Sequence, residues 1–353
     1  MKKIALILLS VLFLCNMFIS GCQKEQVEED LPKLIEDEFD IKNEEHINWY
    51  GRVYFDRINQ AMRFDNTISG FEINFFGTTL DAEIVAQGGA NGNCWVSIFV
   101  DKEKEPEKAI ALELQNGRKT YTLVSGLENK LHTVKVLRRT EINHANVSGL
   151  ISLTTDGNFY TPPKKPERKI DYYGASSMCG FGSIGEKSDL TFTTDTEDGV
   201  SAFSYYTSAL LNAQSNVFCA SGWGLGVNKT SSISAIYNQY TIFNKQEWDF
   251  EKYVADAVVI NLGYNDQKTF GSSGTAIYAE RQAQFKTLLK EFVRKLSMHY
   301  PDAYIYVTYG IWAEYQIYDL YDNTIQELND DGYTKVIAFK LYTPGVREIG
   351  SGY

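Results

Sequence analysis

The sequence predicts a β-sandwich followed by a three-layer α/β/α domain that is built on a parallel sheet. Two patterns carry this prediction. Short alternating strands with turn residues between them fill residues 47–160, and strands alternate with helices in residues 168–353. Between them lies Thr161-Pro162-Pro163-Lys164-Lys165-Pro166, a stretch typical of a stiff, polar linker, which we place at residues 161–167.

The chain begins with a segment typical of export signals. Two lysines precede an apolar run, Ile4 to Ile19, which is too short and too early for a membrane-spanning helix of the mature protein. The run ends in Ile19-Ser20-Gly21-Cys22, which resembles the cleavage box of bacterial lipoproteins. We therefore expect a signal peptide over residues 1–21 and a lipid on Cys22 that holds the protein to a membrane. An ordinary secretory signal that happens to contain a cysteine is the alternative.

Residues 22–46 are acidic and poor in packing residues, which predicts a solvated tether between the lipid and the first domain. Directly after the cysteine, Gln23-Lys24-Glu25 resembles the signals that send some lipoproteins to the outer cell surface. We therefore expect an exported lipoprotein of the bacterial outer membrane or cell surface. The formal net charge of −11 and the lack of a basic stripe in the sequence argue against nucleic acid as a partner.

The first domain is predicted from strands in which apolar and polar residues alternate. The segments Phe71 to Phe75 and Leu80 to Ala86 both show this period of two. Trp95 to Val100 and Thr133 to Leu137 continue in the same style, and turn signals such as Asn91-Gly92 separate the strands. We interpret residues 47–160 as an antiparallel β-sandwich.

The second domain is predicted from a regular alternation of strands and helices. A long helix from about Ile277 to Met298 carries one apolar stripe at helical spacing. Such an alternation gives a parallel sheet covered on both faces, and ligands of these sheets bind at the carboxyl ends of the strands. The other expected elements are a helix at Val200–Ala213 and strands at Ile170–Tyr173, Val217–Ala220, Ala257–Asn261, Tyr304–Thr308 and Val336–Phe339.

Three polar, glycine-flanked turns follow three successive strands of this predicted sheet. Gly174-Ala175-Ser176-Ser177 offers a hydroxyl, Ser221-Gly222-Trp223-Gly224 an unobstructed backbone N–H, and Gly263-Tyr264-Asn265-Asp266 a side-chain amide. A nucleophile and donors for an oxyanion are most of the groups needed to cleave an ester. Each turn alone is equally typical of a loop or a helix cap, so it is their order along the chain that favours catalysis.

The ordered turns resemble those of the SGNH (GDSL-like) hydrolase superfamily, and the chain after the tether is similar to carbohydrate esterase family two. The turn at Ser176 matches the serine block, Ser221–Leu225 the glycine block and Asn261–Asp266 the asparagine block. The strands near Phe71 and Leu131 resemble that family's N-terminal jelly-roll domain. The resemblance implies deacetylation of plant polysaccharides such as xylan or mannan, with no cofactor and no metal.

The resemblance also implies roles for single residues. Ser176 would be the nucleophile, and Gly222, Asn265 and the backbone N–H of Ser176 would form the oxyanion hole. Trp223, inside the glycine block, presents an aromatic face that suits the apolar face of a sugar ring; a packed loop aromatic is the alternative. Ala175 stands where the family commonly has an aspartate, which concerns the support of the loop more than the attack itself.

The family's fourth block supplies a histidine shortly after the last strand, and no histidine follows His299 in this sequence. His299 is expected at the opposite end of the sheet, while His46, His132 and His144 belong to the tether and the first domain. We therefore expect a second domain that is truncated before its catalytic histidine. A positioned base is typically worth ~10²–10⁴ in rate, so this chain by itself would be a poor catalyst.

Two other functions stay open at this point. One is a non-catalytic, glycan-binding surface lipoprotein that keeps the hydrolase fold without the base. The other is an esterase for a different acetylated substrate, such as peptidoglycan. Besides Cys22, the processed chain would keep Cys94, Cys179 and Cys219, an odd number that leaves at least one free thiol. Cys179 and Cys219 both follow strands that lead into the candidate turns, so they form either a bridge or two separate buried thiols.

Overall fold

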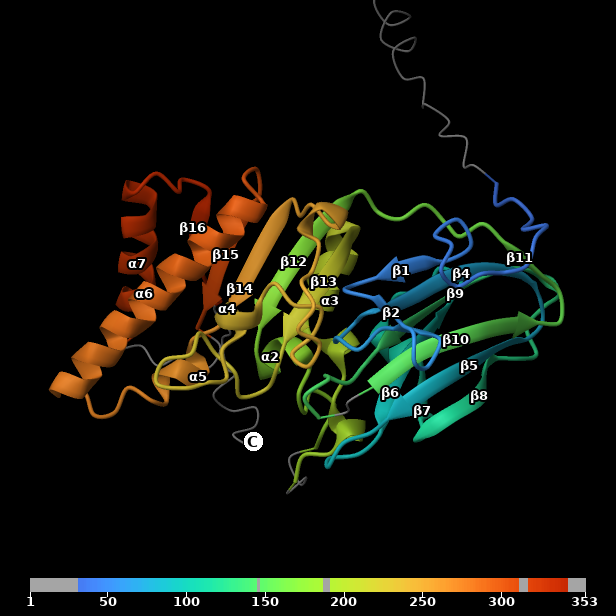
Figure 1. Ribbon diagram of the computed structural model, residues 1–353, viewed down its shortest axis with the longest axis horizontal. Coiled ribbons are helices and arrows are strands. Elements are labelled where there is room, and N and C mark those ends of the chain that lie inside the picture. Colours follow the sequence, from blue (N-terminus) through green and yellow to red (C-terminus); the bar gives the residue numbers. More distant parts are fainter. Residues whose placement is uncertain (1–30, 145–146, 187–190, 311–316, 342–353) are drawn as a thin grey trace, which may run out of the picture. The chain divides into compact units, whose positions relative to one another are not determined.

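The computed structural model describes residues 31–144, 147–186, 191–310 and 317–341 (Figure 1). From Lys33 onward the chain forms one compact unit, in which two architectures follow each other along the sequence. The predicted signal peptide, Cys22 and the first part of the predicted tether lie outside the described residues. Within the ranges given, the structure contains no helix that is both long and apolar enough to cross a membrane.

The first architecture consists of two antiparallel sheets that enclose one apolar core (Figure 1). One sheet has the order β1-β4-β9-β6-β7 with β11 also paired to β4, and the other has the order β2-β3-β10-β5-β8. The first contains β1 (Asn48–Tyr50), β4 (Gly70–Gly77), β6 (Cys94–Val100), β7 (Ile110–Leu114), β9 (Lys130–Arg138) and β11 (Asn158–Tyr160). The second contains β2 (Tyr54–Asp56), β3 (Ala61–Arg63), β5 (Leu80–Gln87), β8 (Gly117–Val124) and β10 (Val147–Thr155). The predicted sandwich is confirmed.

The alternation in sequence becomes an alternation in burial. In β5, Leu80, Ala82 and Ile84 are fully buried, while the residues between them are half-exposed. Because side chains of a strand point to opposite faces in turn, this pattern places one face of β5 in the core. The short 3₁₀ helix η1 (Pro106–Lys108) connects β6 to β7.

The second architecture is a five-stranded parallel sheet of order β13-β12-β14-β15-β16, as predicted. Its strands are β12 (Arg168–Gly174), β13 (Ala213–Cys219), β14 (Ala257–Asn261), β15 (Tyr304–Tyr309) and β16 (Val336–Lys340). Strand β12 pairs with both β13 and β14, so the three strands that precede the candidate turns are neighbours.

Helices cover both faces of this sheet, which confirms the three layers (Figure 1). On one face, α6 (Ala276–His299) and α7 (Tyr318–Asp330) pack in a common core with Tyr173 and Ile260. On the other face, α2 (Ser176–Cys179) and α3 (Phe203–Leu211) pack with Tyr172 and Val217. The remaining short helices are η2 (Thr194–Thr196), η3 (Gly199–Ser201), α4 (Ile233–Ile236), η4 (Phe250–Lys252) and α5 (Tyr264–Gln267).

Two details differ from the sequence-based expectation. The helix expected at Val200–Ala213 is α3, which is shorter because Asn212 adopts a left-handed φ of 47° that ends the helix before β13 begins. Helix α7 was not predicted, although its buried Tyr321, Thr324, Ile325 and Leu328 follow the helical repeat. The polar threonine in that stripe weakens the apolar pattern.

The predicted solvated tether is wrong for residues 33–46, which lie against the sandwich. Leu34 forms an antiparallel bridge with Tyr160, and the carbonyl of the buried Ile41 accepts a hydrogen bond of 2.9 Å from Trp49 Nε1. The rings of Phe39 and Phe159 lie 4.1 Å apart. These few apolar residues are diluted by many acidic ones, so the average composition concealed them.

Candidate active site

The three candidate turns start from the same level of the parallel sheet. In the strand register, Gly174 of β12 lies opposite Cys219 of β13 and Asn261 of β14. Each of these residues is the last of its strand, so the turns that follow leave the sheet side by side at its carboxyl edge. This is the edge at which such sheets bind ligands.

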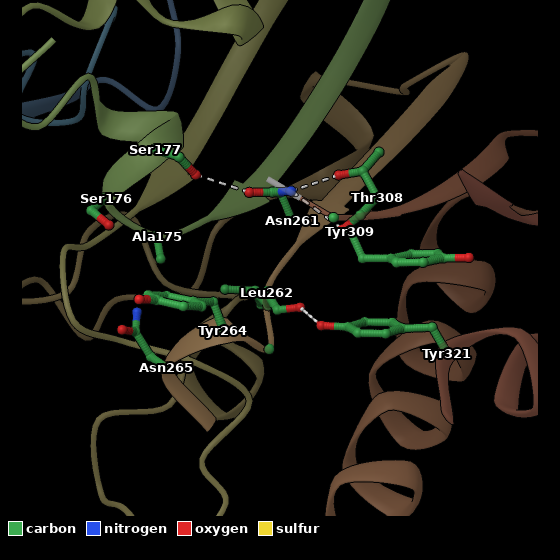
Figure 2. A pocket seen from close by; sticks show the side chains of 12 residues that line it. Ala175, Ser176, Ser177, Asn261, Leu262, Tyr264, Asn265, Thr308, Tyr309 and Tyr321 are labelled. Atoms are coloured by element: carbon green, nitrogen blue, oxygen red, sulfur yellow. Dashed lines mark hydrogen bonds between the residues drawn. The ribbon is translucent and has the colours of Figure 1, made fainter. Parts of the chain in front are cut away.

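A pocket at this edge contains two of the predicted catalytic residues, Ser176 and Asn265 (Figure 2). Figure 2 shows both on one side of the pocket, with Tyr309 and Tyr321 on the other. Gly222 does not belong to the lining of this pocket. The lining consists of Ala175, Ser176, Ser177, Asn261, Leu262, Gly263, Tyr264, Asn265, Thr308, Tyr309, Gly310 and Tyr321.

Ser176 is the first residue of α2, directly after the extended Ala175 at its N-cap. The amide groups of Met178 and Cys179 donate to the carbonyl of Ala175 at 3.0 and 3.1 Å, which forms the tight strand-to-helix turn. A Cβ at Gly174 would lie 2.6 Å from the sulfur of Met178, so the turn requires glycine there. The side chain of Ala175 makes no capping hydrogen bond. An aspartate at this position would supply one and so support the turn.

Gly222 adopts a left-handed φ of 80°, a conformation that favours glycine. A Cβ at this position would meet no heavy atom within 4 Å, so the space beside the residue is open. Backbone conformation, and not crowding, therefore explains the glycine.

Asn265 connects the asparagine turn to the glycine turn. It lies in the first turn of α5, is 7% exposed, and donates from Nδ2 to the carbonyl of Trp223 at 2.8 Å. A side-chain amide has two hydrogens, so this bond leaves the second hydrogen with a fixed direction. Trp223 itself is half-exposed and packs with its other part against the core.

Asp266 is a residue that sequence reasoning left as a possible helix cap. Its buried carboxylate accepts three hydrogen bonds of 2.9 Å, from the backbone N–H groups of Leu225, Gly226 and Val227. Burial raises the pKa of Asp266, and the three N–H groups oppose that rise. Asp266, which belongs to the asparagine turn, thus fixes the position of the second half of the glycine turn.

A chain of side-chain hydrogen bonds crosses the strand ends beneath the pocket (Figure 2). Ser177 Oγ donates to Asn261 Oδ1 at 3.0 Å, and Asn261 Nδ2 donates to Thr308 Oγ1 at 2.9 Å. Ser177 follows β12, Asn261 ends β14, and Thr308 is the next-to-last residue of β15. They fix the relative positions of three strand ends on which the pocket is built.

The four histidines of the sequence are all described, and each has partners away from this pocket. All of these partners lie 2.7 to 3.2 Å from a ring nitrogen. His46 contacts the amide of Asp40, and His132 contacts Asp101 and the carbonyl of Glu128. His144 contacts Asn91, and His299 contacts the hydroxyl of Tyr237. Burial lowers the pKa of His144 and of His299. Over the described part of the chain, no cluster of three or more histidine, cysteine or acidic side chains could hold a metal.

Cys179 and Cys219 form a disulfide with a Cα–Cα distance of 5.9 Å. The bridge joins the end of α2 to the end of β13, and therefore the serine turn to the strand that leads into the glycine turn. Cys94 is buried in the sandwich as a free thiol. Of the two possibilities left open by the sequence, the bridge is the correct one.

Two residues of the sandwich reach the glycine turn, and the sequence contains no signal for them. Glu141 Oε2 accepts a hydrogen bond of 2.7 Å from the amide of Ser221, and Asn143 Nδ2 donates to the carbonyl of the same residue at 3.3 Å. Both side chains lie between β9 and β10. Glu141 is separated from Ser221 by 80 positions, so no local pattern connects them.

Known proteins resemble both architectures. Residues 49–163 match the family described as carbohydrate esterase 2 N-terminal. The cellulase/esterase CelE of Acetivibrio thermocellus is 31% identical over 251 residues, which are 69% of this chain and 29% of that protein. The acetylxylan esterase / glucomannan deacetylase of Cellvibrio japonicus is 28% identical over 246 residues, which are 66% of this chain and 63% of that protein. The chain therefore spans less than two thirds of the length of either curated relative.

A solved structure extends the likeness across both architectures. The family two carbohydrate esterase from Clostridium thermocellum, solved in complex with cellohexaose, superposes with a TM-score of 0.73 at 27% identity. The match covers 83% of this chain and 88% of that one. Residues 49–163 carry the N-terminal domain of carbohydrate esterase family 2, and the chain as a whole resembles a solved family two carbohydrate esterase in both architectures.

Proposed function

We propose that this protein is a serine esterase that removes O-acetyl groups from plant cell-wall polysaccharides such as xylan and mannan. The observation that carries the proposal is the placement of Ser176 and Asn265 in one pocket at the carboxyl ends of adjacent parallel strands. The relatives support the substrate class, since one is named an acetylxylan esterase / glucomannan deacetylase. The complex of another relative with cellohexaose supports a glycan as the ligand.

In this proposal Ser176 Oγ attacks the carbonyl carbon of the acetyl group, and the carbonyl oxygen becomes an oxyanion. The N–H groups of Gly222 and Ser176 and the amide of Asn265 donate to that oxygen, and each such donor is typically worth ~10²–10³ in rate. Cleavage of the C–O bond leaves the acetyl group on Ser176 and releases the sugar hydroxyl with a proton. Water then attacks the acetyl-serine and frees acetate.

A general base must take the proton from Ser176, and we propose that none of the four histidines of this sequence is that base. Their contacts support this, because each is engaged with residues outside the pocket lining. Single exchange of each histidine for glutamine tests it. Each variant should keep the wild-type kcat, and a loss of ~10²-fold or more in one of them would identify that histidine as the base and contradict the proposal.

The test of the activity uses the full-length protein with acetylated xylan, acetylated glucomannan and 4-nitrophenyl acetate. Ser176→Ala should abolish acetate release, and Asn265→Ala should lower kcat by ~10²-fold or more with a smaller effect on KM. Ser273→Ala, at an exposed loop position before α6, is the matched serine control and should keep wild-type activity. Activity that survives Ser176→Ala would overturn the nucleophile, and acetate release from peptidoglycan alone would change the substrate.

A second candidate function is glycan binding without catalysis. It is favoured by the hydrogen bond from Asn265 to Trp223, which ties a predicted catalytic residue to the residue expected to stack on sugar. This function predicts affinity for xylan or cello-oligosaccharides without acetate release, and loss of that affinity in Trp223→Ala. Binding that does not depend on Trp223 would exclude this site as the glycan surface.

We also propose that the protein is exported and anchored through a lipid on Cys22, at the bacterial outer membrane or cell surface. The Cys179–Cys219 disulfide supports an oxidising compartment. Labelled fatty acid should be incorporated into the wild type and not into Cys22→Ala, which should leave the membrane fraction. Protease treatment of intact cells then distinguishes the outer surface from the periplasmic side.

A further inference from the structure

The backbone of Ser221, the residue before Gly222, is held from the β-sandwich on both sides. Asn143 Nδ2 donates to the Ser221 carbonyl at 3.3 Å, and Glu141 Oε2 accepts from the Ser221 amide at 2.7 Å. The two bonds therefore fix the residue that precedes Gly222 on both its donor and its acceptor side. Glu141 is fully buried, so its bond is shielded from water.

The carbonyl of Ser221 and the N–H of Gly222 belong to one peptide group. A trans peptide is planar, so its C=O and N–H point in opposite directions, and whatever orients the one orients the other. The bond from Asn143 to the carbonyl thus sets the direction of the Gly222 N–H. Without this bond the N–H of Gly222 could point in several directions. A glycine with a φ of 80° and open space beside it places few limits on the backbone there.

The origin of these bonds differs from that of the other contacts to the same turn. Asp266 holds the amides of residues 225–227 from within the parallel-sheet domain. The bonds to Ser221 come from the β-sandwich, from the loop between β9 and β10. This loop is itself held by a hydrogen bond of 3.1 Å from the Glu141 amide to Glu197 Oε2. The sandwich thus acts on the first half of the turn, where the predicted oxyanion donor lies.

We infer that Asn143 and Glu141 are positioning residues that aim the Gly222 N–H at the oxyanion, an inference that rests on the proposed esterase function. The sandwich contributes to catalysis through them without touching the substrate. Loss of a well-aimed donor lowers kcat and leaves ground-state binding of the sugar largely unchanged. A purely structural contact between the two architectures would lower stability without this selective loss of kcat.

The first test compares two variants of the full-length protein with the wild type. Asn143→Asp keeps the size of the side chain and removes the donor, so kcat should fall at least tenfold with KM changed less than about threefold. Asn66→Ala is the matched control, because Asn66 Nδ2 also donates from the sandwich to a carbonyl of the other domain, that of Tyr240, at 2.8 Å. It should keep the wild-type kcat. An equal kcat in Asn143→Asp and Asn66→Ala would overturn the inference.

Amide hydrogen exchange gives a readout that does not depend on ester hydrolysis. The Ser221 amide should exchange at least tenfold faster in Glu141→Leu, while Glu141→Gln, which keeps an acceptor, should retain protection and kcat. Unchanged exchange in Glu141→Leu would also overturn the inference. If Ser176→Ala leaves hydrolysis intact, the proposed function fails, and the exchange rates still decide whether the sandwich holds the backbone of Ser221.

Discussion

Among the contacts between the β-sandwich and the parallel-sheet domain, two buried polar ones have opposite character. In the first, which we name the arginine contact, Arg52 donates from Nη1 to the carbonyls of Tyr237 and Gln239 at 2.6 and 2.5 Å. Its Nη2 donates to the Tyr173 hydroxyl at 2.8 Å and lies 3.9 Å from Asp171 Oδ2. In the second, the glutamate contact, Glu141 and Asn143 hold Ser221.

The arginine contact joins opposite charges that are both fully buried. Asp171 also accepts hydrogen bonds from Tyr173 and Tyr300 at 2.8 and 2.9 Å and from Asn216 at 2.8 Å. Burial still raises the pKa of Asp171, while Arg52 and these donors favour its charged form. A buried charge with this many partners is suited to holding two domains in one arrangement.

The glutamate contact instead brings two acids together. Burial raises the pKa of Glu141 to about 7, and burial together with the charge of Glu141 raises the pKa of Glu197 well above its usual value. Both side chains are fully buried, and Glu141 Oε1 lies 3.4 Å from His144 Nε2. The difference between the two contacts suggests a division between attachment and positioning.

The largest expected effect comes from breaking the arginine contact. Arg52→Met leaves Asp171 buried without its cation, so the free energy of unfolding should fall by about 3–5 kcal/mol, measured by denaturant unfolding. Arg118→Met is the control, since Arg118 pairs with Glu83 at 2.6 Å on the surface and its loss should lower the free energy of unfolding far less. Equal losses in the two variants would show that the arginine contact does not hold the domains together.

The disulfide should produce the second-largest effect, at the sheet edge to which the glutamate contact attaches. Cys179 and Cys219 are 40 positions apart, and removing a bridge over such a loop typically costs about 2–4 kcal/mol. Cys179→Ser should therefore unfold at lower denaturant and lose its response to reductant. Cys94→Ala should keep that response. A wild type whose unfolding is the same with and without reductant would contradict this prediction.

Local pattern was sufficient for the elements whose burial follows a simple period. Strand β14 occupies the predicted Ala257–Asn261, and α6 extends one residue beyond each predicted end, because an apolar run and an apolar stripe mark them clearly. The pattern failed for residues 33–46, where Phe39 and Ile41 pack against the sandwich within an acidic stretch. It also missed α7, whose buried face includes Thr324.

The candidate site could be predicted only as far as strand ends determine it. Ser176 and Asn265 meet because parallel strands in register bring their carboxyl ends to one edge. Glu141 and Asn143 come from a loop of the other architecture, and their partners are a backbone amide and a backbone carbonyl. Any residue can supply such groups, so no sequence pattern identifies the contact.

The pH dependence of stability should distinguish the two contacts further. The raised pKa of Glu141 means that the folded state favours the neutral form of this acid. The contribution of Glu141 to stability is therefore full below about pH 4.5 and is lost as pH rises through about 7. Glu197→Gln should reduce the loss of stability between pH 5 and pH 8 by on the order of 1–3 kcal/mol. Thermal unfolding at several pH values measures it, with the exposed Glu251→Gln as control. Parallel curves for Glu197→Gln and the wild type would contradict the shared burial of the two acids.

The smallest effect concerns the serine turn, which the parallel-sheet domain builds from its own residues. Ala175 is the N-cap of α2 and offers no side-chain acceptor to the first turn. Ala175→Asp should add about 0.5–1 kcal/mol to the free energy of unfolding through a cap and the helix dipole, with kcat changed less than about threefold. Ala175→Ser, which caps without a charge, separates the two contributions. A large rise in kcat for Ala175→Asp would mean that the position of the serine turn, like that of the glycine turn, limits the rate. Positioning would then depend on residues of the parallel-sheet domain as well as on contacts of the sandwich.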